Sequence, residues 1–199
     1  DNLVCEFQVR TILQDAWAEV AMGQSAPAEK TGVLLVHYGT RNDASRKATI
    51  DALDSMAMAR FADCEVVEAY AAGSVIKSLG KRGIKKLTIG EGLDKLIADG
   101  CQNAVVQTTM LLDGVMNDIV KNEVNARKSK FKKIVVARPL LYSVDDCRNM
   151  LDQIAAHIKA KSDEQVVIVG HGSDSPANAI YSQLDCLAKF EGRPNWHVG

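Results

Sequence analysis

The feature that most constrains the fold is a repeated alternation of short apolar runs with amphipathic segments. The runs VLLVHY (33–38) and QVVIVG (165–170) are almost wholly apolar, as is typical of strands buried on both faces of a sheet. Between them, apolar residues recur at helical spacing: Ile50, Leu53, Ala57 and Phe61. Strands that alternate with helices pair in parallel through right-handed crossovers. We therefore predict an α/β fold with a parallel sheet and helices on both of its faces.

The same patterns predict the remaining elements. Further strands are expected at 64–71, 103–109, 132–140 and from 195 onward, and further helices at 74–82, 92–100, 116–128, 147–158 and 176–190. Residues 23–31 are expected to form a linker, because GQSAPAEK is small, polar and contains a proline.

Composition excludes several classes of function. Lys and Arg total 24 and Asp and Glu total 25, so the chain has no charge excess for nucleic acid or an anionic membrane. No apolar run approaches the ~20 residues that span a bilayer. Charges such as Glu6 and Arg10 interrupt the amino end, which does not resemble a signal peptide. Five cysteines at wide spacing, without a CxxC pair, favour a reduced, cytoplasmic protein.

His171 is the best placed of the four histidines. It directly follows an apolar run and lies between Gly170 and Gly172, which allow a sharp turn and leave the imidazole unobstructed. An imidazole at the carboxyl end of a strand can bind a metal or accept a proton, although a histidine can also simply cap a turn there. His37, inside a strand, is interpreted as a satisfied core or face residue, and no role is assigned to His157 or His197.

Ligands of open α/β sheets bind beyond the carboxyl ends of the strands. This rule selects three loops: 39–42, 108–114 and 170–173. The turn at Gly39 and Thr40 could bind an oxyanion through its amides and hydroxyl. The chain lacks GxGxxG, GxxxxGK[ST] and GxSxG, so we expect neither nucleotide binding nor a nucleophile-elbow hydrolase.

Several ordered stretches resemble the anaerobic sirohydrochlorin cobaltochelatases of cobalamin biosynthesis, a family of class II tetrapyrrole chelatases. They are KTGVLLVHYGTRNDASRKATIDAL, EAYAAGSVIKSL, DKLIADGCQNAVVQTTMLLDG and VVIVGHGSDSPANAIYSQLD. The resemblance extends from Gly32 to Gly199, and it is the order of several motifs together that makes it specific.

The resemblance implies two α/β halves that face each other across a tetrapyrrole cleft. The first half would be 32–143 and 144–199 the start of the second. Family members insert a divalent metal, Co²⁺ first and Fe²⁺ or Ni²⁺ as alternatives, into sirohydrochlorin without a nucleotide. His171 would be both metal ligand and catalytic base. The residues expected to face the tetrapyrrole are Gly39, Thr40, Met110 and Leu111. Homo-oligomers are a further expectation.

The chain also departs from the family pattern. Met110 stands where the family often has a histidine, and Val115 and Met116 replace a glutamate and an aromatic residue. The sequence ends at Gly199, before the family's acidic residue and second histidine. We therefore expect impaired metal insertion, with a non-catalytic paralogue that binds a tetrapyrrole or metal as the alternative.

The amino end resembles a different family. The run CEFQVRTILQDAWAEV is similar to a strand and helix of RelA/SpoT-type (p)ppGpp synthetases, through Glu6, Gln8, Arg10 and Thr11. Residues 1–20 carry this resemblance, and 1–22 are expected to be a strand–helix fragment. A (p)ppGpp-related function is the third hypothesis.

Overall fold

The computed structural model describes residues 29–199 apart from 159 and 162. Its first sheet has four parallel strands in the order β2-β1-β3-β4. These are β1 Thr31–His37, β2 Glu65–Tyr70, β3 Asn103–Thr108 and β4 Lys133–Val136. Because β1 is paired on both sides and covered on both faces, every one of its residues is buried.

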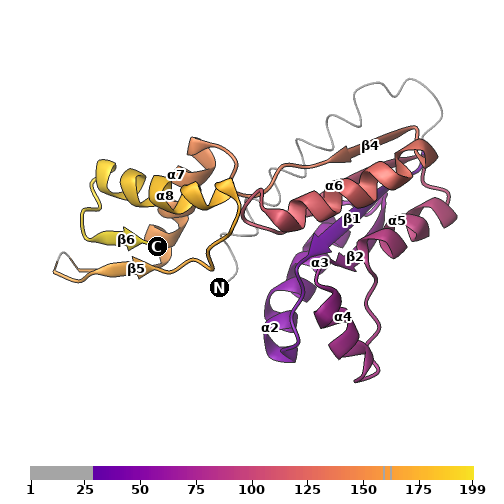
Figure 1. Cartoon of the computed structure of the whole chain (residues 1–199), viewed down its shortest axis with the longest axis horizontal. Coiled ribbons are helices and arrows are strands. Elements are labelled where there is room, and N and C mark those ends of the chain that lie inside the picture. Colours follow the sequence, from indigo (N-terminus) through magenta and orange to yellow (C-terminus); the bar gives the residue numbers. More distant parts are fainter. Residues whose placement is uncertain (1–28, 159, 162) are drawn as a thin grey trace.

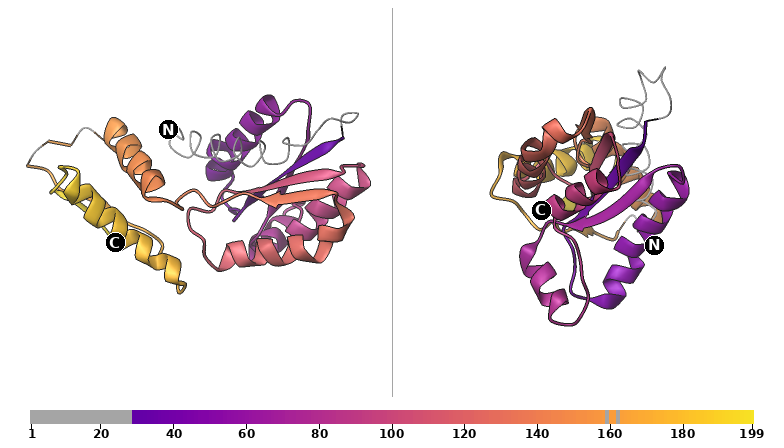
Figure 2. Two further views of the ribbon diagram at one scale, coloured as in Figure 1. Left: turned by 90° about the horizontal axis from the view of Figure 1, so that it is seen from above. Right: turned by 90° about the vertical axis from the view of Figure 1, so that its right-hand side faces the viewer.

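Five helices surround this sheet. They are α2 Asp43–Ala48, α3 Ile50–Arg60, α4 Gly73–Gly80, α5 Ile89–Ala98 and α6 Val115–Arg127, the last followed by the short turn η1 Lys128–Lys130. Alternate residues of β1 enter two cores: Leu34 packs on the side of α5 and α6, and Leu35 on the side of α3. The views in Figure 2 show the strands between these two layers. The predicted α/β fold, with helices on both faces of a parallel sheet, is confirmed.

A second, two-stranded parallel sheet follows. It pairs β5 Val166–Ile168 with β6 Trp196–Val198. The helices α7 Val144–His157 and α8 Ala179–Phe190 pack on it, the latter preceded by the turn η2 Pro176–Asn178. Leu151, Leu184 and Trp196 belong to their shared core. Val167 lies on the other face of the strands and is 65% exposed.

An extended segment joins the two units (Figure 1). The predicted strand 132–140 ends earlier, at Val136. Beyond it, the amides of Leu140 and Leu141 donate to the carbonyls of Met110 and Leu111, 3.3 and 2.8 Å away. The segment after β4 therefore no longer pairs with β3 but with the loop that follows β3.

Two expectations concern residues outside the described part of the chain: the fragment at 1–22 and the linker up to residue 28. The division between 143 and 144 stays a prediction. Within the described residues, no helix has both the length and the hydropathy needed to cross a bilayer.

Candidate functional site

The turn after β1 is held by close packing. Gly39 has φ +98°, a backbone conformation that disfavours any residue with a Cβ. A methyl group there would also lie 2.4 Å from Cδ2 of Tyr70. The hydroxyl of Thr40 accepts a hydrogen bond from the amide of Asn42, 3.2 Å away. Gly39 and Thr40, the two residues of this turn that were predicted to face the tetrapyrrole, are partly buried. The hydroxyl of Thr40 stabilises the turn itself.

The loop after β3 is fixed through its backbone. In addition to the bonds to Leu140 and Leu141, the side-chain amide of Asn117 donates to the carbonyl of Leu112, 3.1 Å away. The two predicted residues differ: Met110 packs partly against the first core, whereas Leu111 is 47% exposed. Leu111 is thus the better placed of the two to meet a ligand from solvent.

His171 lies beyond the carboxyl end of β5, as the sequence predicts. Gly170 is required by packing, since a methyl group there would lie 2.0 Å from Cε1 of Tyr181. Gly172 is required by its backbone, with φ +75°. Between them the His171 side chain is exposed, and its ring has no hydrogen-bond partner among the described residues. Its nitrogens are therefore open to a metal ion or a proton.

The loops after β3 and β5 meet. A methyl group on Gly114 would lie 3.5 Å from Oγ of Ser173 and 3.7 Å from Oγ of Ser175. Ser175 is also the N-cap of η2, where its hydroxyl accepts from the amide of Ala177, as expected of a helix-start residue. A cavity of about 280 Å³ lies beside this junction, lined by Leu112, Asp113, Leu141, Tyr142, Pro176, Ala177, Ala179, Ile180 and Gln183.

The structure thus brings together the segments that carry Leu111 and His171, which are 60 residues apart in sequence. Among the contacts of the described residues, Gly39 and Thr40 meet Tyr70 and Asn42 instead.

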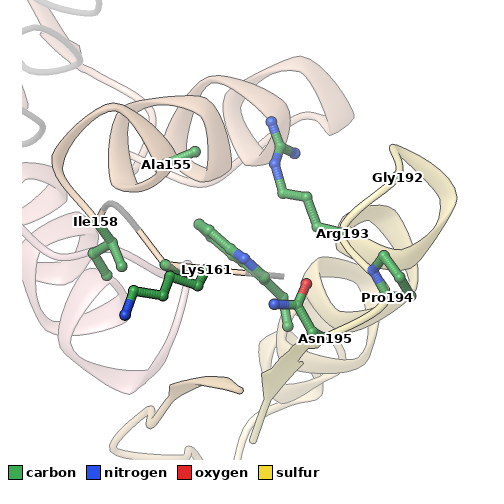
Figure 3. A pocket seen from close by; sticks show the side chains of 9 residues that line it. Ala155, Ile158, Lys161, Gly192, Arg193, Pro194 and Asn195 are labelled. Carbon is green, nitrogen blue, oxygen red and sulfur yellow. The ribbon is translucent and has the colours of Figure 1, made fainter. Parts of the chain in front are cut away.

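A larger cavity, of about 530 Å³, lies at the opposite end of the second sheet (Figure 3). Lys161 and Asn195, which line it, precede β5 and β6, so it opens at the amino ends of these strands. The guanidinium of Arg193 lies 5.6 Å from the ring centroid of Trp196 and pairs with Asp152 and Glu191. Because Arg193 is already paired and the strand-end rule favours the other edge, we place the candidate site at His171.

A separate cluster of polar side chains surrounds His37, which is 1% exposed. Its Nε2 is 2.9 Å from Oδ1 of Asp54 and its Nδ1 is 3.0 Å from Oγ1 of Thr109. Both ring nitrogens have partners, so the interpretation of His37 as a satisfied core residue is confirmed. Glu68 completes a possible ligand group, whose atoms lie within 4.8 Å of one another, but it is paired with Lys86 at 2.6 Å. Sequence patterns did not reveal this cluster, because its members come from three separate elements and a loop.

The fold places the chain among α/β proteins of the chelatase type. The structure of SirB from Bacillus subtilis with Fe³⁺ has a similar fold, with a TM-score of 0.62 over 84% of this chain and 64% of that one. The two sequences are only 16% identical, so this likeness concerns the fold alone.

The family follows from the sequence comparison. The family model described as cobalt chelatase (CbiK) matches residues 31–199, and the chain belongs to this family. The sirohydrochlorin cobaltochelatase of Salmonella typhimurium is 28% identical over 167 residues, which are 83% of this chain. The sirohydrochlorin cobaltochelatase CbiKC of Nitratidesulfovibrio vulgaris is 28% identical over 180 residues, or 88% of this chain. The chain covers 63% of the length of each relative.

The resemblance to cobaltochelatases is therefore confirmed. The resemblance of residues 1–20 to RelA/SpoT synthetases falls outside both the described residues and the range of the family match.

Proposed function

We propose that the chain serves the insertion of a divalent metal into sirohydrochlorin, with His171 as the first protein ligand of the metal and as an acceptor of a pyrrole proton. Co²⁺ is the favoured substrate, and Fe²⁺ and Ni²⁺ are alternatives. The observation that carries the proposal is the approach of Gly114 to Ser173, which joins the loop of the exposed Leu111 to the loop of the exposed His171.

The exposed imidazole suits the divalent metal, and the exposed apolar loop suits sirohydrochlorin. A neutral imidazole is a good ligand for borderline divalent ions such as Co²⁺ and Fe²⁺. The exposed side chains of Leu111, in the loop after β3, and of Tyr142, which lines the cavity beside the junction, offer apolar area to the face of a macrocycle. One imidazole holds a metal weakly compared with the three or more ligands of most protein sites. We therefore propose low metal affinity and slow insertion for this chain, in a cytoplasmic setting.

The test is the insertion of Co²⁺ into sirohydrochlorin, followed by the absorbance change of the macrocycle. We expect His171→Ala to abolish insertion. His157→Ala is the matched control, because His157 is also exposed and its Nδ1 bonds the carbonyl of Gln153 in its own helix. Equal rates in the two variants would refute the role of His171.

The alternative is a protein that binds a tetrapyrrole without inserting metal. Its support is that Met110, Val115 and Met116 stand where the resemblance to the family leads us to expect a histidine, a glutamate and an aromatic residue. A saturable absorbance shift of sirohydrochlorin with no insertion of Co²⁺ would favour this alternative.

A further inference from the structure

A buried series of hydrogen bonds connects α3 with the loop after β3. It consists of the carboxylate of Asp54, the imidazole of His37 and the hydroxyl of Thr109. Asp54 is 8% exposed and His37 1% exposed, whereas Thr109 is only partly buried. This series of hydrogen bonds therefore begins in the core and ends at a residue that is only partly buried.

The chemistry of the two ends fixes the direction of the hydrogen bonds. An ionised carboxylate can only accept, so Nε2 of His37 donates to Asp54. In a neutral ring Nδ1 is then an acceptor, and the hydroxyl of Thr109 donates to it. The other acceptor near this hydroxyl, the carbonyl of Val36, is 3.5 Å away, which is beyond the usual range for such a bond.

The groups that face His37 are charged or aromatic and come from several elements. Asp54 approaches from α3, and Glu68 from β2. Lys86, in the segment after α4, pairs with Glu68 at 2.6 Å. Tyr70 of β2 meets the imidazole edge-on, and burial raises the pKa of its hydroxyl, so it stays neutral. With His37 neutral these groups carry one negative charge in total, and with His37 protonated they carry none.

The outer end of this series of hydrogen bonds is in the loop after β3, which also carries Leu111. Thr109 immediately precedes Met110 and Leu111, in the loop whose Gly114 contacts the His171 loop. Its amide donates to the carbonyl of Val36, 2.9 Å away, so the residue is fixed to the end of β1. Thr109 is thus a positioned hydroxyl backed by a buried base.

We propose that Thr109 transfers a pyrrole proton to His37 during metal insertion; this inference rests on the proposed function. As the metal replaces the proton on a pyrrole nitrogen, that proton moves to Oγ1 of Thr109, and the hydroxyl proton moves to Nδ1 of His37. The resulting imidazolium is paired with Asp54 and returns its proton to solvent by the reverse route. Thr109 contacts the substrate, and His37 and Asp54 are positioning residues that act through it.

Two conservative variants test the transfer. Thr109→Val keeps the shape of the side chain but removes the hydroxyl, and Thr109→Ser keeps the hydroxyl. We expect Thr109→Val to lower kcat for Co²⁺ insertion by about 10²-fold, the lower end of general acid–base contributions. The titration midpoint for sirohydrochlorin binding should not change, and Thr109→Ser should retain most of the rate. A rate for Thr109→Val equal to that of the parent, or a Thr109→Ser variant as slow as Thr109→Val, would overturn the proposal.

A second measurement separates this inference from the proposed function. Imidazole ¹⁵N NMR of the full chain reports which ring nitrogen of His37 carries the proton, whether or not insertion occurs. The proposal requires a proton on Nε2 and an unprotonated Nδ1 in the neutral ring, and uptake of a proton at Nδ1 when the pH is lowered. A neutral ring protonated on Nδ1, or a ring that takes up no proton between about pH 8 and 5, a range that spans the ordinary histidine titration, would exclude the relay. Absence of insertion by the parent chain would instead count against the proposed function.

Discussion

The two glycines beside His171 have different physical roles. Gly172 adopts a positive φ, whereas Gly170 leaves room for the ring of Tyr181. Together they fix the loop so that His171 is directed to solvent and not into the core of the second unit. The position of the His171 side chain therefore depends on the absence of side chains at Gly170 and Gly172.

We expect Gly170→Ala to destabilise the protein by about 1–3 kcal/mol, because its methyl group would overlap the ring of Tyr181. Urea denaturation measures the change. Gly80→Ala is the control, since a methyl group there would meet nothing within 4 Å, and its free energy of unfolding should change by less than about 1 kcal/mol. Similar losses in both variants would show that packing at Gly170 is not the cause.

At the scale of elements, the start of α7 depends on one buried carboxylate. Asp146 forms a capping box with Ser143 and pairs with Arg138, which lies between β4 and α7. Burial acts to raise the pKa of Asp146, but hydrogen bonds from Ser143 and the guanidinium of Arg138 outweigh it and hold the pKa below its usual value. The ionised carboxylate thus links the segment after the first sheet to the first helix of the second unit.

We expect Asp146→Asn to lower the free energy of unfolding by about 1–3 kcal/mol at pH 7, from the loss of a charged cap and ion pair. Because the folded pKa lies below the unfolded value of about 3.9, this stabilisation is complete above that pH. It is lost as the pH falls through the folded pKa. Urea denaturation at neutral and acid pH should show the difference from the parent shrinking in acid.

Asp145→Asn is the matched control for this effect. Asp145 is the preceding residue, is exposed and, among the described residues, pairs with Arg148 on the helix surface. Its removal should change stability by less than about 1 kcal/mol at either pH. A pH-independent loss in Asp146→Asn would contradict the account of its ionisation.

Apolar periodicity predicted the described strands and most helices, because burial on a sheet leaves a pattern along the sequence. It did not predict the end of β4 at Val136, since the change of partner from β3 to the loop at Met110 is a tertiary event. The short helix α2 was also missed, because none of its residues is buried. The apolar run and its glycines predicted the position of His171 beyond the end of β5, whereas no local pattern joins His37 to Asp54 and Thr109.

On the scale of the whole molecule, two adjacent leucines belong to different cores. Leu140 packs in the core between α3 and the first sheet, and Leu141 packs with α7, α8 and the second sheet. This short segment therefore ties the two units together, next to the junction of the candidate site.

We expect Leu140→Ala and Leu141→Ala each to cost about 2–5 kcal/mol, but in different places. Native-state hydrogen exchange should show faster exchange in β1 and β3 for the first variant, and in β5 and α8 for the second. Equal changes in both units for either variant would mean that the two cores unfold as one.

The central claim, that His171 is where the metal first meets the protein, can be tested by following the imidazole NMR signals of all four histidines during titration with paramagnetic Co²⁺. The account predicts that the signal of His171 shifts or broadens at the lowest Co²⁺ concentration. The signals of His157 and His197, and that of the buried His37, should change only later or not at all. A first response from His37 would instead identify the cluster with Asp54 and Glu68 as the metal site and contradict the assignment to His171.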